Sequence, residues 1–416
     1  MSDGDRSLQF ASDGVTPSVA ADAASAPAGW LERLFSAAGK ELPCSFTVHM
    51  PSGATTRIGP GEPDFDLYIH NDEGMKALRS FEELVIAQAY VRGDLDIEGD
   101  VIKAMWLRDF ISDKNLWLKI WARLQPLLLG RERLNPAWIA KHYDSKNIQL
   151  FALDRDYYAY TPGIYLTDDD TLEESTRRKY EFAWDSMKLK PGDEALEVGC
   201  GWGGYTRYCA SRGVKMTAIT LSRDQLGFTQ KIIDDNGLDA KASYQDFFTF
   251  EPGRRFDAIS CMGVIEDLSD YTRVMKHFTT LLKPGGRIYL DFASGKVPFG
   301  TSSFVTKYIW PGTFRMAYMP EMMEAIDKSW LQLVGLYNDR HNYHLWARNG
   351  HRRWVERKDE IIAQSSKETW RLFRLLYMGT SGVMNNPSNE VTAYRLVLEL
   401  PSTYRIETNG PPVRPS

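Results

Sequence analysis

The 416-residue chain has few cysteines, no excess of positive charge and no long apolar run, and each shortage excludes a class of protein. Its cysteines show neither a C-x-x-C pair nor metal-ligand spacing with histidine, so we expect reduced thiols and no metal site. A formal net charge of −5 gives no reason to expect nucleic acid. No window approaches the roughly 18 uninterrupted apolar residues of a membrane span, which predicts a cytoplasmic protein.

Composition and patterning predict two domains with terminal tails. Residues 1–28, rich in Ala, Ser, Asp and Gly, lack the apolar core of a secretory signal and are expected to be disordered. Strand-like runs at 45–50 and 66–70 and a helical stretch at 81–90 predict a small α+β domain over residues 29–115.

Residues 116–138 are predicted to form an amphipathic helix and a connector. The helical part sets tryptophans and leucines against basic residues at both flanks. Such a helix either packs between two domains or lies on an anionic bilayer, and the sequence leaves both interpretations open.

The remaining chain, residues 139–405 before a short tail at 406–416, alternates strand and helix patterns. This alternation predicts an α/β fold with a doubly wound, parallel, Rossmann-like sheet. Ligands of such sheets bind at the carboxyl ends of the strands. The apolar runs expected to form the strands are 195–198, 216–221, 256–262 and 287–292.

A glycine-rich turn follows the first of these runs. Glu197 precedes Gly199, Gly201 and Gly203, which alternate with other residues before a helical stretch. Glycine allows positive φ and close approach of the backbone to a ligand, while the N–H groups of the next helix point into the same space. The acid stands before the glycines rather than some twenty residues after them, which argues against a dinucleotide loop. The pattern E-x-G-x-G-x-G instead resembles the first motif of class I S-adenosylmethionine (SAM) methyltransferases.

Residues at the end of the second strand and just before the third complete the predicted cofactor site. Glu197 is expected to reach the ammonium group of a methionine moiety through water; the alternative is that it caps the next helix. Thr220, Leu221 and Gln225 offer a hydroxyl, a backbone and an amide group to a ribose. Asp246 and Phe247 offer a carboxylate and an aromatic face to an adenine. Together these residues predict SAM as the cofactor.

These motifs, in this order, resemble the cyclopropane-fatty-acid synthase family, which includes the mycolic acid cyclopropane synthases, over most of the chain. The matching residues are His142-Tyr143-Asp144, Asn147, Tyr160-Thr161 in the active-site cover, the Glu197–Gly204 turn, Thr220-Leu221-Ser222 with Gln225, and Gly263-Val264-Ile265-Glu266. The early run Gly93-Asp94-Leu95-Asp96-Ile97 looks like part of the amino-terminal domain of bacterial phospholipid-modifying members.

The resemblance implies methyl transfer to an alkene carbon of an unsaturated acyl chain, usually esterified in a phospholipid. Attack leaves a carbocation on the neighbouring carbon. In cyclopropanating members a bound bicarbonate removes a proton from the new methyl group and the ring closes. Loss of a proton from the chain instead gives a methyl-branched or methylene-branched product. The resemblance also implies peripheral contact with the inner face of the membrane and a homodimer.

The family pattern breaks around the bicarbonate site. Glu266 matches the bicarbonate-orienting glutamate, but Pro162 replaces a cysteine and offers no N–H, and Asp291 replaces a histidine. Because two close carboxylates seldom both ionise, we expect an altered or absent bicarbonate site, with Asp291 or Glu266 itself as the base. Ring closure and methylation with double-bond migration both stay open, as does a purely structural role for Asp291.

Further along, His341 and Tyr343 are candidates to face the cation. A tyrosine ring can stabilise a carbocation and a histidine can act as a base, while a core role suits either residue. Trp370, Phe373, Tyr377 and Met378 recur at helical spacing, which favours a core helix whose one side could line an acyl channel.

The leading interpretation is a SAM-dependent C-methyltransferase of unsaturated phospholipid acyl chains. The alternatives are a methyltransferase for a soluble small molecule and a non-catalytic lipid-binding protein with a degenerate site.

Overall fold

The computed structural model describes residues 42–111, 113, 148–268, 270–297, 302–310, 315–386, 388 and 391–406. The predicted tail at 1–28, the amphipathic segment 116–138, the family residues His142–Asp144 and Asn147, and the domain boundaries near 28, 115 and 138 lie outside these ranges. Within them, no helix combines the length and the apolar character needed to cross a bilayer.

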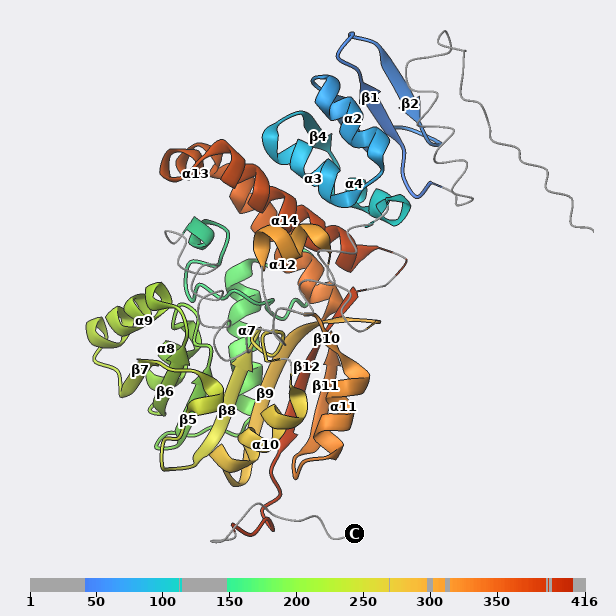
Figure 1. Cartoon of the computed structure of the whole chain (residues 1–416). Helices are drawn as coiled ribbons and strands as arrows, with labels where there is room; N and C mark the ends of the chain where they lie inside the picture. The colour runs from blue at the N-terminus through green and yellow to red at the C-terminus, as the bar shows by residue number, and fades with distance from the viewer. Residues whose placement is uncertain are drawn as a thin grey trace, which may run out of the picture.

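The N-terminal unit is a small sheet with helices packed on it (Figure 1). Its strand order is β2-β1-β3-β4, with β1 parallel to β3 and the other pairs antiparallel. Alternate residues of β1 and β3 are buried, as expected for strands with one face on a core. The elements are β1 (Phe46–His49), β2 (Thr55–Ile58), β3 (Phe65–Ile69), α2 (Asp72–Ser80), α3 (Glu83–Arg92), β4 (Leu95–Gly99), α4 (Val101–Ala104) and the 3₁₀ helix η1 (Met105–Phe110).

The predicted α/β fold is confirmed by a second, larger sheet, ordered β11-β12-β9-β8-β5-β6-β7, with β10 beside β9. Strands β7, β6, β5, β8 and β9 are parallel. Four of these match predicted runs. The strands are β5 (Glu194–Val198), β6 (Lys215–Thr220), β7 (Ala240–Tyr244), β8 (Phe256–Met262), β9 (Leu282–Gly295), β10 (Ala317–Tyr318), β11 (Gln332–Asn338) and β12 (Val391–Glu399).

Two features of this sheet were not anticipated. Strand β7 was missed because it is an edge strand whose residues are only half-buried or exposed, so it has no continuous apolar run. The sheet is also not wholly parallel, since β12 runs antiparallel to both β9 and β11.

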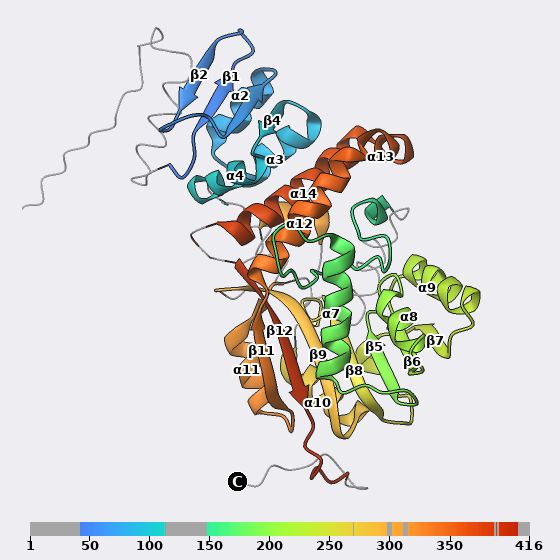
Figure 2. The same cartoon turned by 180° about the vertical axis from the view of Figure 1, so that it is seen from behind.

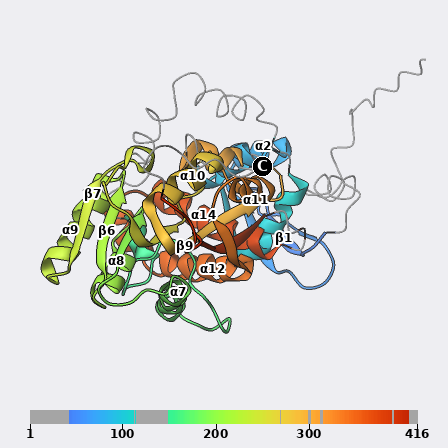
Figure 3. The same ribbon diagram turned by 90° about the horizontal axis from the view of Figure 1, so that it is seen from below.

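Helices cover both faces of the large sheet. In Figure 1, α10 (Tyr271–Leu281) and α11 (Met319–Asp327) lie in front of it, and Figure 2 brings α7 (Leu172–Ser186) forward on the other face. From below, α9 and β7 lie at one end of the molecule and β1 at the other (Figure 3). The remaining helices are η2 (Ile148–Phe151), α8 (Gly204–Ala210), α9 (Arg223–Asp235), η3 (Phe247–Thr249), the π-helical turn η4 (Val305–Ile309), α12 (Arg340–Glu356), α13 (Lys358–Gln364) and α14 (Lys367–Asn385).

Helix α14 joins the large sheet to the N-terminal unit (Figure 1). Its Arg371 donates from Nη1 to Asp96 Oδ2 at 3.0 Å and also bonds the backbone carbonyl of Tyr90. Arg374 donates to the Tyr90 hydroxyl at 2.6 Å. Gly382 permits close approach, since a Cβ there would lie 2.4 Å from Met105 Cβ. The two units therefore pack through specific buried contacts.

Candidate functional site

The predicted glycine turn lies between β5 and α8. Gly199, Gly201 and Gly203 adopt φ values of 70°, 51° and 76°, the left-handed region that side chains disfavour. A Cβ on Gly199 would lie 2.3 Å from Val264 Cγ2, whereas one on Gly201 would project into open space. The turn thus brings bare backbone to the edge of a cavity.

This cavity, which we call the turn cavity, lies at the carboxyl ends of β5, β6 and β8. It gathers most of the predicted cofactor residues from separate loops. Those lining it are Tyr160, Thr161, Gly199, Gly201, Thr220, Leu221, Gln225, Asp246 and Phe247, together with Val198, Ile219, Gln245, Met262, Gly263, Val264, Asp267 and Leu268.

Local hydrogen bonds fix the polar groups of the turn cavity. Ser222 caps α9 by accepting from the Gln225 N–H at 3.2 Å, and Thr220 Oγ1 donates to Gln225 Oε1 at 3.1 Å. Asp246 caps η3 through the Phe248 N–H at 2.8 Å, and buried Phe247 packs its ring against Phe278. The cavity therefore combines bare backbone, hydroxyl, amide, carboxylate and aromatic groups, which can accept and donate hydrogen bonds and contact a flat ring.

Glu197 does not itself line the turn cavity, and its contact with a methionine moiety through water stays a prediction. Its buried carboxylate accepts from the Thr206 hydroxyl at 2.5 Å, inside the first turn of α8. Burial raises the pKa of Glu197 to about 8. This geometry matches the alternative interpretation, that Glu197 stabilises the start of the next helix. Gly203 also lies outside the cavity lining, because Thr229 fills the space beside it.

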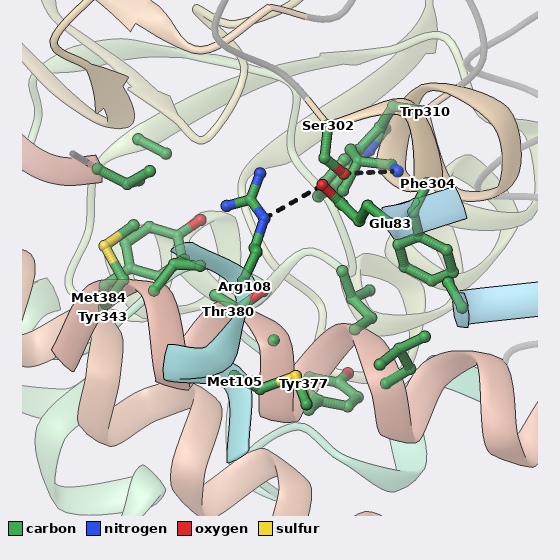
Figure 4. Close-up of a pocket in the computed structure, with 18 of the residues that line it drawn as sticks. Glu83, Met105, Arg108, Ser302, Phe304, Trp310, Tyr343, Tyr377, Thr380 and Met384 are labelled. Carbon is green, nitrogen blue, oxygen red and sulfur yellow. Dashed lines mark hydrogen bonds and ion pairs between the residues drawn. The ribbon is translucent and has the colours of Figure 1, made fainter. Parts of the chain in front are cut away.

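A second, larger space, the apolar cavity, adjoins the turn cavity. Its volume is about 240 Å³ against about 100 Å³, and its walls come from both sheet units. Figure 4 shows Tyr343 and Met384 on one side and Phe304 and Trp310 on the other. Tyr160, Thr161, Gly263 and Asp267 line both spaces and so form the wall between them.

Behind this shared wall lies a buried ion pair that the sequence interpretation missed in part. Lys179, only 1% exposed, donates to the backbone carbonyl of Thr161 at 3.2 Å and to its hydroxyl. Its Nζ lies 3.5 Å from Asp291 Oδ2. Burial raises the pKa of Asp291, and Lys179 opposes that shift. Asp291 lines neither cavity, so the pair holds Thr161 from behind rather than facing a ligand.

Glu266, by contrast, lines the apolar cavity. One carboxylate oxygen accepts from the Ala293 N–H at 2.8 Å, while Oε2 is buried with no hydrogen-bond partner among the described residues. Burial raises the pKa of Glu266 to about 8 and that of its neighbour Asp267 to about 7. Asp267, which the sequence interpretation did not single out, reaches the shared wall.

The structure distinguishes Tyr343 from His341. The half-buried ring of Tyr343 lines the apolar cavity and packs edge-on against Trp346, with centroids 5.6 Å apart. His341 lies on the surface, 2.8 Å from Asp168, with 62% of its side chain exposed. The predicted placement of His341 at the site is therefore corrected.

Helix α14 serves both as core and as cavity wall. Tyr377 lines the apolar cavity together with Leu376 and Thr380, whereas Trp370, Phe373 and Met378 are buried away from it. The helical spacing thus identified a core helix with one side on the cavity.

Three comparisons place the chain among known proteins. The family model for mycolic acid cyclopropane synthetase matches residues 131–392. A probable fatty acid methyltransferase of Mycobacterium tuberculosis is 28% identical over 86% of this chain and 91% of its own length. Cyclopropane-fatty-acyl-phospholipid synthase of Escherichia coli is 32% identical over 42% of this chain and 46% of its own. The crystal structure of mycolic acid cyclopropane synthase CmaA1 complexed with SAH and CTAB superposes with a TM-score of 0.58 at 20% identity, covering 63% of this chain and 97% of that one.

Proposed function

Because the chain belongs to the mycolic acid cyclopropane synthetase family, we propose that it transfers the methyl group of SAM to a double bond in an unsaturated acyl chain of a phospholipid. The observation that carries this proposal is the contact between the two cavities. A polar cavity built on the glycine turn shares a wall with an apolar cavity suited to hydrocarbon.

The turn cavity fits the SAM nucleoside. Gly199 and Gly201 would hold it through bare backbone, Thr220 and Gln225 would bind its ribose, and the ring of Phe247 would lie against its adenine. When bound, SAM supplies an electrophilic methyl group. Tyr160 and Thr161 in the shared wall guide the alkene toward that methyl, and Lys179 holds Thr161 in place from behind.

Methyl addition uses the π electrons of the alkene to form the new C–C bond and leaves a cation on the adjacent carbon. The ring of Tyr343 stabilises this cation through its quadrupole. Glu266 then takes a proton from the acyl chain, and the electrons of that C–H bond form a new double bond. We assign the role of base to Glu266 rather than to Asp291, because Glu266 lines the apolar cavity and Asp291 does not. The acyl chain gains one CH₂ and becomes a methyl-branched alkene.

The family's bicarbonate site is not carried over in this proposal. Glu266 lines the apolar cavity, its buried Oε2 has no hydrogen-bond partner among the described residues, and Pro162 lacks the N–H of the residue that it replaces in the family pattern. Proton loss directly to Glu266 therefore requires no bound anion.

The test uses the purified full chain, SAM with an isotopically labelled methyl group, and vesicles of dioleoyl phosphatidylethanolamine. We expect a product heavier by one CH₂ whose NMR spectrum shows branched-chain protons. Cyclopropane ring protons would overturn the assignment of Glu266 as the chain base while leaving methyl transfer intact. Transfer only to a soluble acceptor, or SAM binding without transfer, would overturn the function itself.

We further propose a cytoplasmic enzyme in peripheral contact with the inner membrane face, acting as a homodimer. The need to take an acyl chain from a bilayer supports the membrane contact. Flotation with vesicles and sedimentation equilibrium test the two statements separately.

A further inference from the structure

An ion pair from the N-terminal unit faces the apolar cavity. Arg108 on η1 and Glu83 on α3 both line it, and Arg108 Nε donates to Glu83 Oε2 at 3.3 Å. The side chains are 36% and 16% exposed. Figure 4 shows the two terminal nitrogens of Arg108 turned away from Glu83. Neither terminal nitrogen has a hydrogen-bond partner among the residues that the structure describes.

This one-armed geometry differs from that of two other partly buried arginine pairs of the chain. Arg353 reaches both oxygens of Glu173 at 2.7 and 2.6 Å and also bonds a backbone carbonyl. Arg178 uses both terminal nitrogens on Asp170. In both of these pairs the terminal nitrogens of the guanidinium take part in the contact. Arg108, which lines the apolar cavity, instead leaves its two terminal nitrogens without a partner among the described residues.

The surroundings of the Arg108 guanidinium are largely apolar and offer it few hydrogen-bond acceptors. The cavity wall near the pair comes from apolar side chains of the N-terminal unit, including Leu78, Ile86 and Met105. The part of the Arg108 side chain that lies against this apolar surface is less well solvated than a fully exposed guanidinium, which favours binding of a ligand that supplies acceptors there. A phosphate accepts two parallel N–H bonds from arginine, which is the arrangement that the free fork offers.

We propose that Arg108 binds the phosphate of a zwitterionic glycerophospholipid and that Glu83 binds its headgroup amine. This inference rests on the proposed function, because the acyl chain of the same lipid must fill the apolar cavity. Arg108 and Glu83 together carry no net charge, so a phosphate with an ammonium group satisfies both. An anionic headgroup without an amine would leave Glu83 facing added negative charge.

This assignment gives each of the two units a different part of the lipid to bind. Glu266 and Tyr343 from the large-sheet unit face the reacting part of the acyl chain, while the N-terminal unit binds the headgroup. A lipid therefore has to contact both units at once, with its charged end and its alkene fixed at separate parts of one cavity.

The experiment measures methyl transfer to dioleoyl phosphatidylethanolamine diluted in vesicles of dipalmitoyl phosphatidylcholine, which has no double bond. We expect Arg108→Gln to raise the half-saturating mole fraction of the unsaturated lipid about tenfold, the loss that follows removal of a charge-assisted hydrogen-bond pair. Turnover at saturation and the Kd for SAM should stay unchanged. The matched control is Arg92→Gln on α3, whose arginine pairs with Asp94 at 2.8 Å and lines neither cavity. Arg108→Lys, which restores charge without the fork, should recover part of the loss.

A second arm identifies the headgroup. Glu83→Gln should lower the preference for dioleoyl phosphatidylethanolamine over dioleoyl phosphatidylglycerol, while free oleate should depend little on Arg108. If wild type and Arg108→Gln reach half-saturation at the same mole fraction of unsaturated phospholipid, the inference is overturned. The proposed function still holds in that case, because the wild type methylates the lipid. A larger effect of Arg108→Gln on oleate than on phospholipid would assign the fork to a carboxylate and overturn the phosphate. If the wild type methylates none of these lipids, the proposed function fails and the inference with it.

Discussion

Replacing Glu266 by glutamine should abolish methyl transfer while making the folded protein more stable. Glutamine keeps the size of the side chain and the acceptor for the Ala293 N–H, but it cannot take a proton from the acyl chain. Removal of a general base lowers turnover by roughly 100-fold to 10,000-fold. We therefore expect kcat to fall into that range while the Kd for SAM is unchanged.

The gain in stability follows from the pKa of the same carboxyl group. Burial raises it from 4.5 to about 8, so between these pH values the folded protein holds a proton that the unfolded chain releases. The folded state consequently loses stability as pH rises through this window, by about 1.4 kcal/mol per pH step. At pH 7 the accumulated cost is about 3 kcal/mol, and glutamine removes it because it does not ionise. Below pH 4.5 Glu266 is protonated in both the folded and the unfolded chain, so wild type and Glu266→Gln should have the same free energy of unfolding.

Urea unfolding at pH 7 and pH 4, followed by tryptophan fluorescence, measures this difference, with single-turnover transfer of labelled methyl as the activity assay. Asp168→Asn is a matched control, because that carboxylate is exposed and pairs with His341 on the surface. A Glu266→Gln protein that retains wild-type turnover would refute the assignment of the base. One that is less stable than wild type at pH 7 would refute the argument from burial.

Three further changes test the rest of the site. Turnover of the wild type should rise with pH and level off above about 8, since Glu266 accepts a proton only when ionised; a flat rate profile from about pH 6 to 9 would contradict this. Gly201→Ala should weaken SAM binding, measured by calorimetry, more than tenfold, because the new methyl group enters the turn cavity. The control is Gly237→Ala, at a glycine with a similar φ of 55° and open surroundings that lies outside both cavities. Both variants should lose about the same free energy of unfolding. Tyr343→Leu should lower kcat about tenfold while Tyr343→Phe retains most of it, because the ring face rather than the hydroxyl stabilises the cation; equal losses in the two variants would point to the hydroxyl.

The parts of the site that the sequence predicted are those set by local structure. A strand, a glycine turn and a helix N-terminus follow one another along the chain, so Gly199 and Gly201 could be placed without knowing the rest of the fold. Thr220 ends β6 and Asp246 lies two residues beyond the end of β7, and parallel strands bring their carboxyl ends to one edge of the sheet.

What the sequence missed depends on contacts between distant segments. Lys179 follows two arginines on an otherwise ordinary amphipathic helix, where it looks like a surface residue; only the packing of α7 beneath Thr161 and Asp291 buries it. His341 and Tyr343 lie two positions apart at the start of α12, so their side chains point about 200° apart around the helix axis. One of them had to face away from the cavity, and the choice depended on how α12 is rotated against its neighbours.

Helix α14 shows why the apolar cavity requires both units. The turns that bear Arg371 and Arg374 bind the N-terminal unit, and the following turns contribute Leu376 and Thr380 to the cavity wall. A buried arginine that loses its partners is strongly destabilising, so these contacts hold the units firmly together. Any separation of the units would open the cavity to water, which would both solvate the cation and compete with the alkene. The same interface that positions the lipid headgroup therefore also keeps the reacting carbons dry.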